Sequence, residues 1–133
     1  MILENNLQSA RQGMIVLIVE DEPIQRMDMI DLVEHAGFEA VGCYNADAAI
    51  DILERRTDIR IVLSDIGMPG SMDGLKMAAF VRKRWPPIQL VLTSAGAKPD
   101  LDTLPARAVF LPKPLDYERA KKVLRDMASA EPA

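Results

Sequence analysis

Short apolar runs alternate with amphipathic segments along nearly the whole chain, and this alternation constrains the fold more than any other feature. Residues 14–19 (MIVLIV) form a continuous apolar run, and residues 59–63 form another that is almost wholly apolar. Runs rich in β-branched residues are typical of strands covered on both faces, as in a parallel sheet. We therefore expect short strands over residues 14–19, 38–43, 59–63, 88–92 and 109–111.

The segments between these runs have the apolar spacing of amphipathic helices. The first opens with Pro23, which the first turn of a helix tolerates, and closes at Gly37. Asn45 is the predicted N-cap of the next helix. We expect helices over residues 23–36, 46–55, 75–84 and 116–127.

The same spacing predicts which helical side chains face the sheet. In the first helix the predicted apolar face consists of Ile24, Met27, Ile30 (or Met29), Val33 and Ala36. In the last helix it consists of Tyr117, Ala120, Val123, Leu124 and Met127. Each helix would then bury one apolar stripe and leave its polar residues in water.

Strands that alternate with helices imply parallel pairing and right-handed crossovers. The expected fold class is therefore α/β, with a doubly wound five-stranded parallel sheet and helices on both faces. One helical slot, residues 98–108, is bracketed by Pro99 and Pro105. Because proline interrupts a helix, we expect this fourth helix to be short or irregular.

Length and composition limit the class of protein further. The 133 residues suit one domain, expected over residues 14–127 between a lead-in (1–13) and a tail (128–133). A formal charge of −4 removes the simplest argument for nucleic-acid binding. The single cysteine, Cys43, excludes an intramolecular disulfide framework and a multi-cysteine zinc site. No apolar run is long enough to cross a bilayer, so we expect a cytoplasmic protein.

Polar side chains collect where the predicted strands end. They are Glu20, Asp21, Asp65, Thr93, Ser94 and Lys113. Each has an ordinary interpretation when taken alone, such as helix-dipole charge for the acids or a solvated surface position for the lysine. The carboxyl ends of parallel strands meet at one edge of a sheet, which is where such folds bind ligands. The coincidence of all six at that edge therefore favours a site.

Three carboxylates close together repel one another, by about 4 kcal/mol for each pair at an effective dielectric constant of 20. A cluster of this kind needs a cation or a shared proton. Lys113 can offset one charge, and Mg²⁺, which prefers oxygen ligands, suits the remainder. A site with a metal, an amine, a hydroxyl and a spare carboxylate points to phosphate chemistry, with a carboxylate as the nucleophile.

Four stretches of the sequence, IVEDEP, LSDIGMPGSMDG, VLTSA and FLPKP, resemble the signature of receiver domains of two-component response regulators. They occur in the family's order, and the resemblance runs from about Ile15 to Met127. It implies a flavodoxin-like fold of the chemotaxis-regulator type, with sheet order 2-1-3-4-5. It also implies that Asp65 accepts a phosphoryl group from the phosphohistidine of a histidine kinase or a histidine phosphotransfer protein. No enzymatic activity beyond Mg²⁺-dependent self-phosphorylation and self-dephosphorylation is implied.

The resemblance also implies the ligands of the metal. Asp21 and Asp65 would bind Mg²⁺ directly, and Glu20 would act mainly through water. The backbone carbonyl of Gly67 would be a further protein ligand.

The remaining roles concern the phosphoryl group and its readout. Lys113 would pair with the phosphoryl group, Thr93 would hydrogen-bond to it, and the small Ser94 would leave the approach open. Phe110 would be the aromatic switch residue that turns inward when Thr93 moves. Pro114 would follow Lys113 in a cis peptide bond. A downstream protein would then read the rearranged face, and a dimer is possible.

Two alternatives to this hypothesis require residues that this chain does not match. A haloacid-dehalogenase-type phosphatase wants a second aspartate two residues after the nucleophile, where this chain has Gly67. A pseudo-receiver that only docks partners usually lacks an acid or the lysine, and all of these are present.

The loop between Pro69 and Asp73 has three residues where the common pattern has two. The 19 residues after Pro114 leave no room for a DNA-binding domain, so we expect the signal to leave by contact with another protein.

Overall fold

The computed structural model of the chain describes residues 14–67, 73–96 and 98–130. The predicted lead-in (1–13), the lengthened loop at 70–72 and the last three residues of the predicted tail lie outside the described residues.

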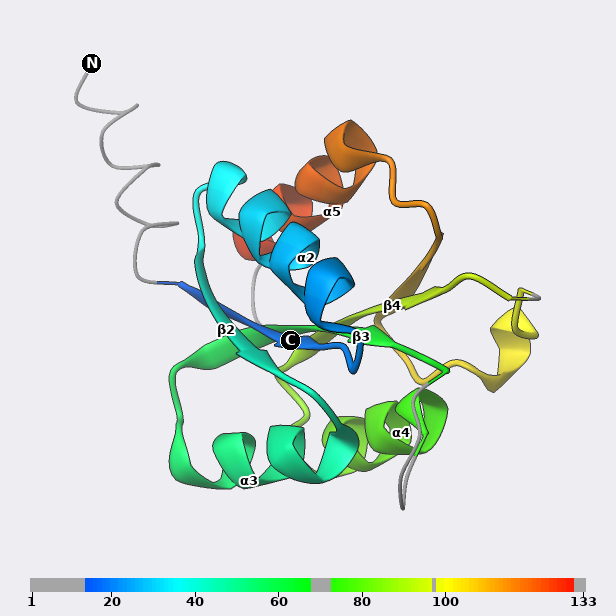
Figure 1. Cartoon of the computed structure of the whole chain (residues 1–133). Coiled ribbons are helices and arrows are strands. Elements are labelled where there is room, and N and C mark those ends of the chain that lie inside the picture. The colour runs from blue at the N-terminus through cyan, green and yellow to red at the C-terminus, as the bar shows by residue number, and fades with distance from the viewer. Residues whose placement is uncertain (1–13, 68–72, 97, 131–133) are drawn as a thin grey trace.

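In the described part of the chain, five parallel strands form one sheet in the order β2-β1-β3-β4-β5 (Figure 1). This confirms the predicted fold class and strand order. The strands are β1 (Ile15–Val19), β2 (Glu39–Cys43), β3 (Ile59–Asp65), β4 (Gln89–Ser94) and β5 (Ala108–Pro112). Val19 pairs with Ser64, and Asp65 pairs with Thr93, so the carboxyl ends of the central strands lie level with one another.

Among the described residues, the helices lie in pairs on the two faces of the sheet (Figure 1). Helices α2 (Pro23–His35) and α5 (Tyr117–Ser129) lie on one face, and α3 (Ala46–Arg55) and α4 (Gly74–Arg84) lie on the other. The side chain of Asn45 caps α3 by accepting from the backbone N–H of Ala48, as predicted. The fourth slot holds a single 3-10 turn, η1 (Leu101–Thr103), as its flanking prolines predicted.

The apolar strands place a core on each side of the sheet. On β1 every residue is buried, with Leu17 and Val19 facing α3 and α4 while Val16 and Ile18 face α2 and α5. This alternation is the reason that β1, which is covered on both faces, is apolar throughout. Cys43 is buried at the end of β2, as expected of a small core residue.

The predicted apolar face of α2 is wrong at its start. Ile24 and Met27 are 69% and 63% exposed. The predicted residues Met29 (the alternative to Ile30), Val33 and Ala36 are buried, together with Leu32, which was not predicted. Each step of three residues falls about 60° short of a full helical turn, so the predicted stripe winds around the helix. The buried set mixes steps of three and one residues and therefore stays on one side.

The predicted face of α5 fails at one position for a different reason. Ala120, Leu124 and Met127 are buried, whereas Tyr117 is 44% exposed. Tyr117 is the first residue of the helix, and its hydroxyl reaches the backbone carbonyl of Asp28 on α2 at 3.4 Å. Within the described residues, none of the helices is long and apolar enough to span a membrane.

Candidate functional site

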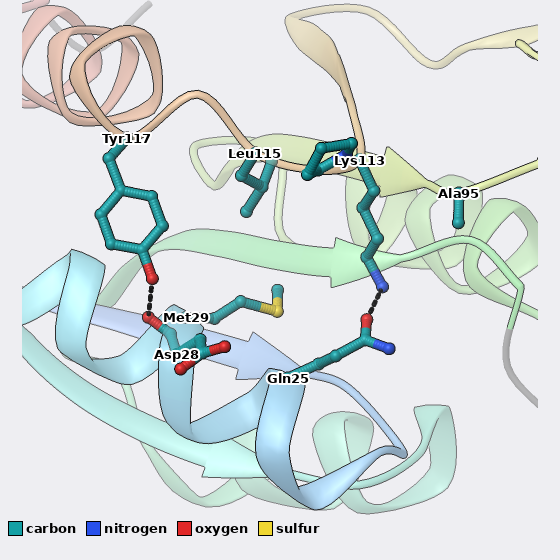
Figure 2. A pocket seen from close by; sticks show the side chains of 8 residues that line it. Gln25, Asp28, Met29, Ala95, Lys113, Leu115 and Tyr117 are labelled. Carbon is teal, nitrogen blue, oxygen red and sulfur yellow. Dashed lines mark hydrogen bonds between the residues drawn. The ribbon is translucent and has the colours of Figure 1, made fainter.

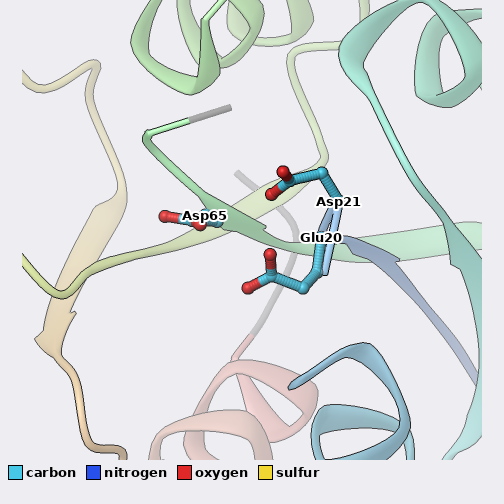
Figure 3. A group of neighbouring side chains, drawn as sticks. All are labelled: Glu20, Asp21 and Asp65. Atoms are coloured by element: carbon cyan, nitrogen blue, oxygen red, sulfur yellow. The ribbon is translucent and has the colours of Figure 1, made fainter. Parts of the chain in front are cut away.

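Three carboxylates converge at the carboxyl edge of the sheet, the edge where its strands end (Figure 3). Glu20 and Asp21 directly follow β1, and Asp65 ends the neighbouring strand β3. One oxygen of each carboxylate lies within 4.8 Å of the others. Glu20 is 1% exposed and Asp65 8%, while Asp21 is exposed. The convergence predicted from the sequence is therefore present, with two acids buried and one in contact with water.

Lys113, which follows β5, reaches into this cluster. Its Nζ donates to Glu20 Oε1 at 2.6 Å and to Asp65 Oδ2 at 3.2 Å. The same atom donates to Gln25 Oε1 on α2 at 2.6 Å. One ammonium group faces three carboxylates, so a net negative charge remains at the edge.

The charges of the cluster alter one another's proton affinity. Burial raises the pKa of Glu20 above its usual value, and the charge of Asp65 adds to this, although the hydrogen bond from Lys113 opposes it. Burial lowers the pKa of Lys113, but the hydrogen bond to Glu20 and the charge of Asp65 outweigh it, so the pKa is raised overall. Lys113 is therefore charged at neutral pH, and the charge of Glu20 is only partly compensated.

A glycine allows the chain to pass closely over Asp65. Gly74 begins α4, and its N–H donates to the carbonyl of Ile66 at 2.9 Å. A Cβ at Gly74 would lie 2.3 Å from the carbonyl oxygen of Asp65 and 2.6 Å from Cα of Ile66. Both are backbone atoms, so any larger residue would force α4 away from the site. The sequence predicted a helix from residue 75 and gave Gly74 no role, although a glycine just after a capping aspartate was a usable signal.

Thr93 contributes a hydroxyl that has no partner. It lies at the end of β4, paired in register with Asp65, and is 0% exposed. Among the side chains of the described residues, its Oγ1 is the buried polar atom without a hydrogen bond. Leaving a buried hydroxyl unpaired costs about 1–3 kcal/mol. A bound group with acceptor oxygens near Asp65 would supply the missing partner.

The other predicted residues surround this centre. Ser94 Oγ accepts from the N–H of Gly96, and the N–H of Gly67 donates to Asp65 Oδ1 at 3.1 Å. The peptide bond between Lys113 and Pro114 is cis, as the resemblance implied. Phe110 is half-buried on β5 and packs against the core on the α3 and α4 side. Its role as a switch stays a prediction.

The donor set fits a hard divalent cation. All three acids offer oxygen atoms, their charge exceeds that of Lys113, and exposed Asp21 leaves room for water ligands. Mg²⁺ is bound in proteins through one or two carboxylates and keeps several waters. Sequence reasoning found these residues but missed Gln25, because nothing local in the sequence indicates that it reaches Lys113.

A model of the response regulator receiver domain family matches residues 16–125. The chain belongs to this family. It is a receiver domain of two-component systems, and its acidic pocket fits the family's phosphorylation site.

Curated relatives of this receiver domain are much longer proteins. Response regulator protein FleR of Pseudomonas aeruginosa is 36% identical over 80 residues, which are 60% of this chain and 16% of FleR. Sensor kinase CckA of Brucella abortus is 32% identical over 116 residues, which are 84% of this chain and 12% of CckA. The match therefore spans less than a fifth of either relative.

Solved structures share the fold of this receiver domain. A response regulator receiver protein from Sinorhizobium medicae superposes with a TM-score of 0.82 at 23% identity, covering 89% of this chain and 96% of that one. Response regulator TrrA from Thermotoga maritima, solved in complex with Mg²⁺ and BeF, superposes with a TM-score of 0.76 at 24% identity, covering 85% of this chain and 97% of that one. At these identities the likeness establishes the architecture.

Proposed function

We propose that this receiver domain accepts a phosphoryl group on Asp65 from a phosphohistidine of a histidine kinase or histidine phosphotransfer protein. The observation that carries the proposal is the bridge that Lys113 Nζ makes between Glu20 and Asp65 beside Asp21. A cluster with one cation for three acids is suited to receive Mg²⁺ and a phosphoryl group, whose charges balance each other.

In the transfer, one carboxylate oxygen of Asp65 attacks phosphorus. The bond from phosphorus to the histidine nitrogen breaks, and its electron pair stays on the imidazole. Asp21, Asp65 and the backbone carbonyl of Gly67 would hold Mg²⁺, with Glu20 acting through water, and the bound metal would neutralise charge on the phosphoryl oxygens. Lys113 lies within reach of an oxygen of Asp65 and would donate to the phosphoryl group.

The hydroxyl of Thr93 links phosphorylation to a change of shape. It has no partner in the unphosphorylated domain, so moving toward a phosphoryl oxygen gains a hydrogen bond at the cost of none. Ser94 beside it is small and leaves this approach open. Phe110 would then turn toward the vacated space, and a downstream protein would read the altered face. This is a shift between two populations of one fold.

The test uses acetyl phosphate as a small phosphodonor, with and without Mg²⁺, and intact mass spectrometry. We expect the wild-type chain to gain the mass of one phosphoryl group only with Mg²⁺, with Asp65→Asn remaining unmodified. Asp58→Asn, at an exposed carboxylate paired with Arg56, is the matched control and should be modified like the wild type. Modification of Asp65→Asn, or none of the wild type, would contradict the proposal. Sustained phosphate release from many monoesters would favour a phosphatase instead.

A further inference from the structure

The ammonium group of Lys113 has used all of its hydrogen-bond donors. An ammonium carries three N–H groups, and here they point to Glu20, Gln25 and Asp65. A phosphoryl oxygen on Asp65 can receive a hydrogen bond from Lys113 only if one of these acceptors is given up. The release of an acceptor is therefore part of phosphorylation, and the identity of that acceptor affects the rate.

Gln25 is the acceptor held least firmly. Glu20 is charged and 1% exposed, and Asp65 carries the reacting oxygen itself. Gln25 is neutral and exposed, although its 2.6 Å contact with Lys113 is as short as that of Glu20 (Figure 2). An ammonium group is attracted more strongly by a charged carboxylate or phosphate oxygen than by a neutral amide oxygen, because Coulomb attraction adds to the hydrogen bond. A phosphoryl oxygen therefore displaces the amide oxygen before it displaces Glu20.

The surroundings of Gln25 give its side chain room to leave. It lines a cavity of about 530 Å³ between α2 and the segment after β5. Ala95, Leu115 and Tyr117 lie on other walls of this cavity, and Lys113 borders it as well (Figure 2). The amide can turn into this space without moving the helix that carries it.

We propose that Gln25 is a positioning residue that restrains Lys113 in the unphosphorylated domain and thereby slows phosphorylation of Asp65. The inference rests on the proposed function. An interaction made in the ground state and lost in the transition state raises the barrier between them. Removing the amide oxygen therefore leaves one Lys113 donor free for the incoming phosphoryl group and speeds the transfer.

The test measures the phosphorylation rate with acetyl phosphate and Mg²⁺ in Gln25→Met and Gln25→Asn. Methionine keeps the length of the side chain without a strong acceptor, and asparagine keeps the amide but is one methylene too short. Both rates should rise about threefold to tenfold, which lies within the range for the net contribution of one typical hydrogen bond. The dissociation constant for Mg²⁺ should stay within a factor of two, because Gln25 touches none of the three acids.

Gln89→Met is the matched control. Gln89 donates to the carbonyl of Met127 at 2.8 Å and begins β4, at the opposite edge of the sheet. This variant loses a glutamine hydrogen bond and should keep the wild-type phosphorylation rate. If a change in stability or the loss of any glutamine were enough to speed the reaction, the phosphorylation rate of Gln89→Met would change as well.

The outcomes separate this inference from the proposed function. If the wild type is phosphorylated on Asp65 but the two Gln25 variants react no faster, the restraint on Lys113 is wrong and the proposed function stands. If the Gln25 variants are phosphorylated faster but also bind Mg²⁺ more tightly, the proposed restraint on Lys113 is wrong. The same holds if the phosphorylation rate of Gln89→Met rises equally. If the wild type is not phosphorylated at all, the proposed function fails and the inference fails with it.

Discussion

The polar side chains at the two edges of the sheet differ in how fully they are paired within the fold. At the amino edge, where the strands begin, Arg82 of α4 donates to backbone carbonyl oxygens of Pro86, Ile88 and Ala106. Gln89 at the same edge donates to Met127. At the carboxyl edge three acids share one ammonium group, and the hydroxyl of Thr93 has no partner. In the described residues, these polar side chains of the amino edge have hydrogen-bond partners within the fold. At the carboxyl edge the acids outnumber the one ammonium group, and the hydroxyl of Thr93 has no acceptor.

The difference shows where this domain gives up stability for function. Buried polar groups stabilise a fold only when they are paired. The pairs at the amino edge join α4, β4 and the segment before β5, so they fix the scaffold. The unpaired groups at the carboxyl edge are costs that Mg²⁺ and a phosphoryl group can relieve. Removing a paired group at the amino edge and removing an unpaired or crowded group at the carboxyl edge should therefore change stability with opposite sign.

The largest expected effect is at the amino edge. Arg82→Ala removes the donors to four carbonyl oxygens, of which that of Arg107 is the most distant at 3.4 Å. It should lower the free energy of unfolding by about 3 kcal/mol, at about 1 kcal/mol for each of the three shorter hydrogen bonds. Urea denaturation followed by circular dichroism measures this. Arg84→Ala, in the same helix turn, removes a surface pair with Glu54 at 3.6 Å and a cation–π contact with the ring of Trp85, and should cost about 1 kcal/mol or less. Equal losses of unfolding free energy in the two variants would contradict a stabilising role for the hydrogen bonds of Arg82.

A steric change at the carboxyl edge should also be costly. Gly74→Ala places a Cβ against the backbone of Asp65 and Ile66, so we expect a loss of about 2 kcal/mol in the free energy of unfolding. The displaced Asp65 should also be phosphorylated more slowly by acetyl phosphate. Lys76→Ala, an exposed position of the same helix, is the control that should leave both quantities near the wild-type value. Wild-type stability of Gly74→Ala would show that α4 can shift freely.

Removing the unpaired hydroxyl should stabilise the domain. Thr93→Val keeps the shape of the side chain and should raise the free energy of unfolding by about 1 kcal/mol in the absence of phosphodonor. Ser64→Ala is the matched opposite case, because the Ser64 hydroxyl is buried but donates to the carbonyl of Asp65 at 3.0 Å. It should lose about 1 kcal/mol. Destabilisation by both variants would mean that Thr93 has a partner in solution.

Relief of charge repulsion should give the smallest effect. Without Mg²⁺, Asp65→Asn should raise the free energy of unfolding by about 0.5 to 1 kcal/mol, because the repulsion it removes from Glu20 and Asp21 is largely offset by the lost attraction to Lys113. The asparagine oxygen can keep only one of two hydrogen bonds, because Lys113 donates to Oδ2 of Asp65 and the N–H of Gly67 donates to Oδ1. Asp58→Asn should not stabilise, since it gives up a pairing with Arg56. A lower melting temperature of Asp65→Asn in chelator would contradict the crowding of the acids.

The sequence was sufficient for the features that depend on local pattern. Apolar runs and breaks between them located the strands, and parallel pairing then brought Glu20, Asp65 and Lys113 to one edge. Contacts between distant residues left no local sign. Arg82 meets Ala106 across 24 positions and Gln25 meets Lys113 across 88, so both were missed. The predicted face of α2 failed at Ile24 and Met27 because successive steps of three residues wind around the helix, away from the side that contacts the sheet.

Mg²⁺-dependent stability tests the central claim, that the carboxyl edge lacks a cation, most directly. The free energy of unfolding of the wild type and of Asp21→Asn is measured by urea denaturation in chelator and at increasing Mg²⁺. A ligand that binds only the folded state stabilises it in proportion to the logarithm of its concentration above the dissociation constant. We predict this gain for the wild type and a much smaller one for Asp21→Asn. No gain for the wild type, or an equal gain for both chains, would contradict the account.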